Sequence, residues 1–184
     1  MRKILTHLAL ASLLLGAENF IGSNTEILDK VGGKPLATLF VGAKVEILKD
    51  DKEYVLAQYQ GYLPEGSDIS YARLGVLEAD LKTTNLKALK QVEKVKDDYD
   101  NEWLKVSIKG FVKKDSLKPL ATLQTEGEEL FKTRCGGCHA LHHYDEYNAN
   151  VWPSVVESMR ANSALDDTEF ATLVRFLQSK APTE

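Results

Sequence analysis

The chain has 184 residues, 43% of them hydrophobic, and a formal net charge of -4, a composition typical of one or two small globular domains. The charge is not basic enough to indicate a nucleic-acid partner, and no Gly-rich phosphate-binding loop is present. The acidity is uneven, because residues 124–184 carry ten acidic and five basic side chains whereas residues 18–123 are nearly neutral.

The N-terminus predicts an export signal. Two basic residues, Arg2 and Lys3, precede an apolar run over residues 4–15, and small residues follow, which is the order typical of a secretory signal peptide. The run is too short for a comfortable membrane span. We therefore expect residues 1–17 to be a signal peptide and the mature protein to be periplasmic, with membrane contact only if the signal stays uncleaved.

Residues 22–120 are expected to form a small all-β domain. Short runs rich in Val, Leu and Tyr alternate with Gly or charged turns, at Leu36–Phe40, Lys44–Leu48, Tyr54–Tyr59 and Tyr62–Leu63. No catalytic constellation is visible among these residues. The alternative interpretation is a set of generic β-hairpins.

This β region also contains an internal repeat. Val45–Asp51 returns as Val92–Asp98, and Tyr54–Leu63 returns as Trp103–Val112. Each copy reads strand, acidic turn, strand, glycine, aromatic, strand, so we expect the glycine to allow a bend and the aromatic side chain to fold back onto the core. The pattern resembles the bacterial version of the Src-homology-type small β-barrel, present either as two units or as one elaborated barrel.

Residues 124–184 are expected to form a small all-α domain after a linker over residues 118–124. Thr125 and Glu128 have the spacing of a capping box at the start of its first helix. That helix should bury Leu130 and Phe131 and lead to Cys135. The expected architecture is therefore α+β in two parts.

Two further helices are expected after a loop over residues 141–150. Pro153 suits the first turn of a helix whose apolar face carries Val155, Val156 and Met159. Asp166–Glu169 should cap a final helix that packs against the helix leading into Cys135. The apolar stripe of this final helix consists of Phe170, Leu173, Val174 and Leu177.

The central motif is Cys135-Gly136-Gly137-Cys138-His139, the attachment signature of c-type haem. Two thiols three positions apart lie on one side of a helical turn, so both can add to the vinyl groups of one porphyrin, and the next imidazole can bind the iron. About 60 residues provide little core of their own, which a porphyrin would supplement. We expect one covalent haem c, with Cys135 and Cys138 as thioethers and His139 as the proximal iron ligand.

Three other uses of the cysteines are possible. A zinc site could combine Cys135 and Cys138 with His142 and His143, although adjacent histidines suit a tetrahedron poorly and His139 would have no role. A redox dithiol should open a helix inside a βαβ unit, which the surrounding sequence does not predict. A disulfide would close a strained two-residue loop.

The distal iron ligand is expected to be Met159, the sole methionine after the signal peptide. A buried methionine is more often core filler, but this one lies on the apolar face of a helix in the expected haem domain. His142 and His143 are alternatives that should stay on the proximal side. Trp152 and Tyr147 are expected to pack on or near the haem ring, and Arg134 and Arg160 are weaker candidates for pairing with its propionates.

The motif, the sequence after it and parts of the β region resemble a known protein family. The matching residues are Cys135–His142, Tyr147–Pro153, Met159-Arg160, Ala164–Asp167 and Phe176–Gln178, with Gly33–Leu36, Gly42–Val45, Gly61-Tyr62 and Tyr71–Gly75 upstream. They are similar to the C-terminal monohaem region, with its preceding β domain, of the pentahaem c-type cytochromes that feed periplasmic trimethylamine N-oxide and dimethyl sulfoxide reductases.

The resemblance implies an electron-transfer protein rather than an enzyme, with a periplasmic molybdopterin reductase as its electron acceptor. Those cytochromes also carry a membrane-anchored tetrahaem module, whereas this chain has one C-x-x-C-H motif, so we expect a separate membrane quinol-oxidising cytochrome as the donor. Two alternatives remain. One is a general soluble carrier for another periplasmic oxidoreductase or peroxidase, and the other is a haem-based sensor of small ligands.

Overall fold

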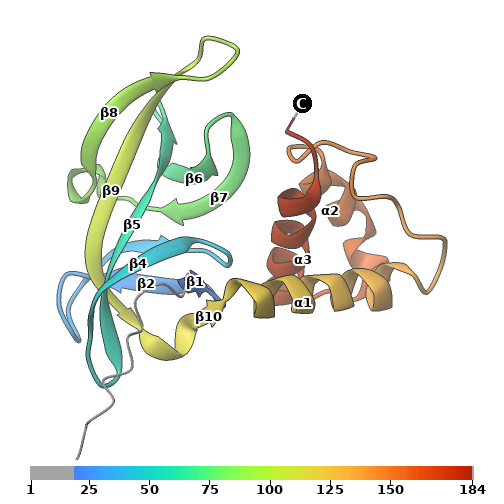
Figure 1. Cartoon of the computed structure of the whole chain (residues 1–184), viewed down its shortest axis with the longest axis horizontal. Coiled ribbons are helices and arrows are strands. Elements are labelled where there is room, and N and C mark those ends of the chain that lie inside the picture. The colour runs from blue at the N-terminus through green and yellow to red at the C-terminus, as the bar shows by residue number, and fades with distance from the viewer. Residues whose placement is uncertain (1–18, 184) are drawn as a thin grey trace, which may run out of the picture.

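The computed structural model describes residues 19–183, so the predicted signal peptide lies outside the described residues. A β-barrel is followed by three α-helices (Figure 1). The expected α+β arrangement in two parts is confirmed. Within residues 19–183, no helix has the length and apolar character needed to cross a membrane.

The β part consists of ten strands within the described residues. They are β1 (Asn19–Ile21), β2 (Thr25–Leu28), β3 (Pro35–Leu39), β4 (Lys44–Asp50), β5 (Tyr54–Pro64), β6 (Ile69–Arg73), β7 (Val76–Lys82), β8 (Lys90–Lys96), β9 (Glu102–Lys113) and β10 (Leu117–Pro119). The sheet closes because β5 pairs with β9, so the order β5-β6-β7-β3-β2-β9 returns to β5 as a six-stranded antiparallel barrel. β4, β1 and β10 continue the sheet beyond β5, and β8 continues it beyond β9.

The two copies of the repeat together build this single barrel. The first copy supplies the β4–β5 hairpin and the second supplies β8–β9. β5 and β9 pair along their whole length, and Tyr59 lies opposite Ile108, its own equivalent in the repeat. An approximate two-fold axis therefore passes between these residues, and the alternative of two separate barrels is wrong.

The repeated glycines, Gly61 and Gly110, lie where the two long strands exchange neighbours. β5 changes from β4 to β6 around Gly61, and β9 changes from β8 to β2 around Gly110. A Cβ at Gly61 would collide with the buried phenol of Tyr59, and one at Gly110 would lie 2.5 Å from the Leu28 carbonyl oxygen. Close packing therefore requires both glycines, and β5 and β9 each continue through their glycine.

The aromatic residues after these glycines do not fold onto the core. Tyr62 and Phe111 are half-buried, whereas the next residues, Leu63 and Val112, belong to the barrel core. Because side chains alternate between the two faces of a strand, a continuous strand that directs Leu63 inward must direct Tyr62 outward. The expectation that these aromatic side chains fold back onto the core is therefore wrong.

The helical part begins without a linker. Its elements are α1 (Leu120–Leu130), the π-helical turn η3 (Phe131–Cys135), α2 (Trp152–Ser163) and α3 (Asp167–Lys180), and the barrel adds two short 3-10 turns, η1 (Leu86–Ala88) and η2 (Lys114–Ser116). Thr125 lies inside α1, where its hydroxyl donates to the Ala121 carbonyl oxygen at 3.0 Å. The predicted cap is therefore wrong. α1 starts directly after the extended Pro119, and it already buries Leu123, two residues before the predicted cap.

The later helices begin as the sequence predicts. Asp166 caps α3 by accepting from the backbone N–H groups of Thr168 and Glu169, and the Glu169 carboxylate accepts from the Asp166 N–H. Pro153 lies in the first turn of α2. α3 packs against α1, as predicted, and its Leu173 and Leu177 are fully buried.

Arg175 of α3 joins the helices to the barrel. Its guanidinium lies 2.8 Å from Glu78 Oε1, pairs with Asp80, and donates from Nε to the Val41 carbonyl oxygen at 3.1 Å. Both carboxylates come from β7 and are buried. Removing a charge from water is costly unless it is paired, so this bridge stabilises one arrangement of the two parts.

Burial raises the pKa of Asp80 from 3.8 to about 6, and the Arg175 charge opposes the rise. A raised pKa in the folded state means that Asp80 stabilises the fold fully below its ordinary pKa and loses that contribution as pH rises through about 6. We expect the free energy of unfolding of the wild type, relative to Asp80→Asn, to fall by roughly 2 kcal/mol between about pH 4 and about pH 7. Urea titrations of both proteins at several pH values measure this difference, and a flat difference would contradict the assignment.

Candidate functional site

The motif cysteines follow a widened turn of helix. α1 continues into η3, whose π-helical residues end at Cys135, and Phe131 at the start of η3 is buried at 3% exposure. Such π-turns are rare and are often found at functional sites. The prediction that the first helix leads to Cys135 is confirmed, with this local widening that no simple sequence pattern indicates.

The two glycines of the motif differ in what surrounds them. A Cβ at Gly136 would lie 2.6 Å from the Lys132 carbonyl oxygen, whereas one at Gly137 would meet nothing closer than the Thr133 carbonyl oxygen at 4.0 Å. Backbone crowding by the π-turn therefore accounts for Gly136. Nothing within the chain requires Gly137 to lack a side chain.

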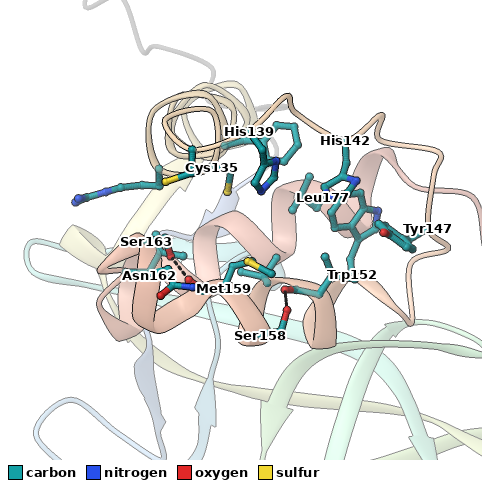
Figure 2. A pocket seen from close by; sticks show the side chains of 16 residues that line it. Cys135, His139, His142, Tyr147, Trp152, Ser158, Met159, Asn162, Ser163 and Leu177 are labelled. Atoms are coloured by element: carbon teal, nitrogen blue, oxygen red, sulfur yellow. Dashed lines mark hydrogen bonds between the residues drawn. The ribbon is translucent and has the colours of Figure 1, made fainter.

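A cleft of about 770 Å³ opens beside the motif, within the range of small-molecule and cofactor sites in proteins. Its walls come from η3, the segment after it, α2 and α3. The lining includes Phe131, Arg134, Cys135, Cys138, His139, His142, Tyr147, Trp152, Val155, Val156, Met159, Leu165 and Leu177. Figure 2 shows Cys135 and His139 on one side of the cleft and Met159 on the other.

His139 presents one ring nitrogen for binding. Its Nδ1 lies 2.7 Å from the Ala140 carbonyl oxygen, which can only accept, so Nδ1 carries the proton and donates. In the neutral imidazole Nε2 then has the lone pair that a metal-binding histidine requires. The side chain is exposed on the cleft.

The two thiols are not joined as a disulfide. Cys135 is half-buried, and this burial raises the pKa of its thiol, while Cys138 is exposed. Both line the same cleft as His139. The structure therefore brings together the three motif residues at one apolar cavity.

The residues of the alternative zinc site do not converge. Across residues 19–183, no three His, Cys, Asp or Glu side chains are placed to hold a metal ion. His142 reaches the cleft, where its Nδ1 is 2.9 Å from Glu146 Oε1, but His143 is not among the lining residues. His142 holds the pKa of Glu146 below its ordinary value by hydrogen bonding.

Met159 projects from α2 across the cleft from the motif (Figure 2). Its side chain is 44% exposed, which is unusual for a methionine that merely fills a core. Trp152 and Met159 are seven residues apart, close to two helical turns, so they share a face of α2. Val155 and Val156, which were predicted to share this face, also line the cleft, and helical spacing from Met159 could further have identified Ser163.

The expected aromatic pair also lines the cleft. The rings of Tyr147 and Trp152 meet edge to face with centroids 5.2 Å apart. Trp152 is almost fully buried, and its Nε1 donates to the Tyr144 carbonyl oxygen at 3.1 Å. This contact fixes the loop before α2 over the cleft wall.

The two candidate arginines have different positions. Arg134 lines the cleft and pairs with Glu169 at 2.6 Å. Arg160 pairs with Asp167 and lies over the Phe170 ring at 4.7 Å, and it is not among the lining residues. The structure therefore supports only Arg134 as a candidate for contact with a group in the cleft.

Comparison with known proteins links this site to cytochromes. The cytochrome c-type protein TorY of Escherichia coli O157:H7 is 31% identical over 150 residues, which cover 79% of this chain and 41% of the relative. TorY of Haemophilus influenzae is 36% identical over 83 residues (45% of this chain, 23% of the relative), and TorC of Escherichia coli O157:H7 is 22% identical over 150 residues (78% and 38%).

The chain is homologous to these c-type cytochromes. The match lies in the C-terminal region of TorY and TorC and confirms the family resemblance drawn from the sequence. The chain spans less than half the length of these relatives. No family model matches the chain, and no solved structure matches it.

The two glycines of the motif give a matched pair of variants. Gly136→Ala should destabilise the protein by about 1–3 kcal/mol, because a methyl group there overpacks against the Lys132 carbonyl. Gly137→Ala should be neutral within about 0.5 kcal/mol. Thermal unfolding of the two purified variants checks both values, and equal stability of the two would contradict the crowding at Gly136.

Proposed function

We propose that the chain is a periplasmic monohaem c-type cytochrome that carries electrons to a molybdenum-dependent reductase of N-oxides or S-oxides. The observation that supports this most strongly is the position of Cys135, Cys138 and His139 on one cleft, with Met159 reaching in from the other side. Homology to c-type cytochromes gives this arrangement its chemical meaning.

The cleft residues fit a covalently attached haem. Both thiols are unpaired and reach the same cavity, so each can form a thioether with the cofactor. The aromatic and aliphatic wall, which includes Trp152, Val156 and Leu177, suits a flat apolar ring. When bound, the haem supplies one-electron chemistry.

The chain itself orients the iron ligands. The Ala140 carbonyl accepts from Nδ1 of His139, which orients the ring and would leave Nε2 available to bind the iron. Met159 would supply a thioether sulfur from α2, and thioether ligation raises the reduction potential of a cytochrome. A raised potential suits a carrier that must accept electrons readily.

The proposed role also implies redox partners and a cellular compartment. Because the relatives are c-type cytochromes, and the described cleft residues would hold one such cofactor, we assign the protein electron transfer rather than catalysis. A molybdopterin reductase would be the acceptor and a membrane quinol-oxidising cytochrome the donor, in keeping with the relatives' family. The predicted signal over residues 1–17 would deliver the chain to the periplasm.

Covalent attachment is tested by replacing both thiols. Protein expressed with its signal peptide should carry one haem that resists acid-acetone extraction, and Cys135→Ser combined with Cys138→Ser should abolish that haem. Gly137→Ala, in the same motif, should keep it, because the position is open. Intact mass of the three proteins measures the result, and free thiols or bound zinc in the wild type would contradict the proposal.

The distal ligand is tested spectroscopically. The oxidised wild type should show the sulfur-to-iron charge-transfer band in the red, and Met159→Ala should lose it. Reduced wild type should bind little carbon monoxide at neutral pH, whereas the variant should bind it readily. A wild type that lacks the band and binds carbon monoxide freely would favour a haem-based sensor instead.

A further inference from the structure

The backbone of Leu77 in the barrel is bound by side chains of the helical part, one from the loop before α2 and one from α3. The N–H of Leu77 donates to Asn150 Oδ1 at 2.7 Å, and the carbonyl oxygen of Leu77 accepts from Gln178 Nε2 at 3.3 Å. Two side-chain amides from the helical part thus bind both polar groups of a single residue in β7. We call this set, Leu77 with Asn150 and Gln178, the β7 clamp.

Further contacts reinforce the β7 clamp. Asn150 Nδ2 donates to the Gly75 carbonyl oxygen at 3.1 Å, and Gln178 Nε2 also donates to the Ala149 carbonyl oxygen at 3.0 Å. Gln178 is buried at 3% exposure, as is Val76, which packs into the hydrophobic cluster of the helices. Because buried amides without partners are costly, the Leu77 carbonyl oxygen of the barrel gives the buried Gln178 amide a second acceptor beside Ala149.

The β7 clamp fixes where α2 begins. Asn150 lies two residues before Trp152, the first residue of α2, and the Asn148 side chain accepts from the backbone N–H groups of Asn150 and Val151 at 3.1 Å. The loop before this point has neither helix nor strand. Met159 follows Trp152 by about two turns on the same face, so the position of the α2 start sets the position of the methionine sulfur.

We propose that the β7 clamp positions Met159, so that the barrel holds the distal ligand against the haem iron. This inference rests on the proposed function, because it assumes the haem and its Met159 ligand. Asn150 and Gln178 are positioning residues, since they act through α2 and do not line the cleft. Loss of either amide should let the start of α2 move and should increase the fraction of molecules in which Met159 is detached.

The test uses the full-length, haem-loaded protein with imidazole as a competing ligand. In the oxidised protein, imidazole binds the iron only when Met159 is detached, so its apparent affinity reports that fraction. Asn150→Ala and Gln178→Ala each remove two side-chain hydrogen bonds, and each should raise the affinity for imidazole roughly threefold to tenfold. Asn85→Ala is the control, because Asn85 is an exposed barrel residue whose side chain caps nothing.

Amide hydrogen exchange at Leu77 provides a second measurement that does not depend on the iron. Exchange should accelerate in Asn150→Ala and stay unchanged in Asn85→Ala. Faster exchange with wild-type imidazole affinity would overturn the positioning role, and unchanged exchange in Asn150→Ala would overturn the β7 clamp. Should Gln178→Ala fail to fold, Asn150→Ala decides alone. A wild type without covalent haem, or without the thioether band, would overturn the proposed function and the inference with it.

Discussion

The size of the helical part constrains the rest of the molecule. A domain of about 60 residues buries little apolar surface and is only marginally stable on its own. The three helices pack chiefly through α1–α3 and α2–α3, which leaves apolar surface beside the motif. The barrel supplies part of what is missing. Val76 enters the helical core, and Glu78 and Asp80 receive the buried Arg175.

One strand makes these contacts possible. β7 is a barrel strand between β6 and β3, and four of its residues contact the helices. Val76 does so by packing, Leu77 by its backbone, and Glu78 and Asp80 by their carboxylates. In α3, Arg175 and Gln178 bind these β7 residues, and Leu177 lines the cleft. The barrel is therefore part of the structure that shapes the cleft, and a haem would cover the apolar wall that remains.

The sequence predicts the features that have a local cause. Short apolar runs between turns located β4, the internal repeat located β8, the Asp166 cap located α3, and the C-x-x-C-H motif located the cleft. Homology to TorY and TorC then confirmed the resemblance drawn from these residues. The start of α1 was misplaced because Thr125 and Glu128 have the spacing of a cap but lie within a helix that Leu123 anchors earlier.

Other features have no local signal. Two repeats of a strand pattern can form one barrel or two, and the choice depends on β5 pairing with β9 across 49 residues at Tyr59 and Ile108. Arg175 looks like an exposed helix residue until β7 is placed beside it. The same is true of Asn150 and Gln178, whose partners lie 73 and 101 residues away.

The central claim is that His139 and Met159 hold one haem between them in the cleft. The proton NMR spectrum of the reduced protein tests this most directly, with the methyl group of Met159 labelled. A methionine bound to haem iron sits over the ring and its methyl resonance moves far upfield. We expect that shift for Met159, and a Met159 methyl resonance at its ordinary position in haem-loaded protein would contradict the claim.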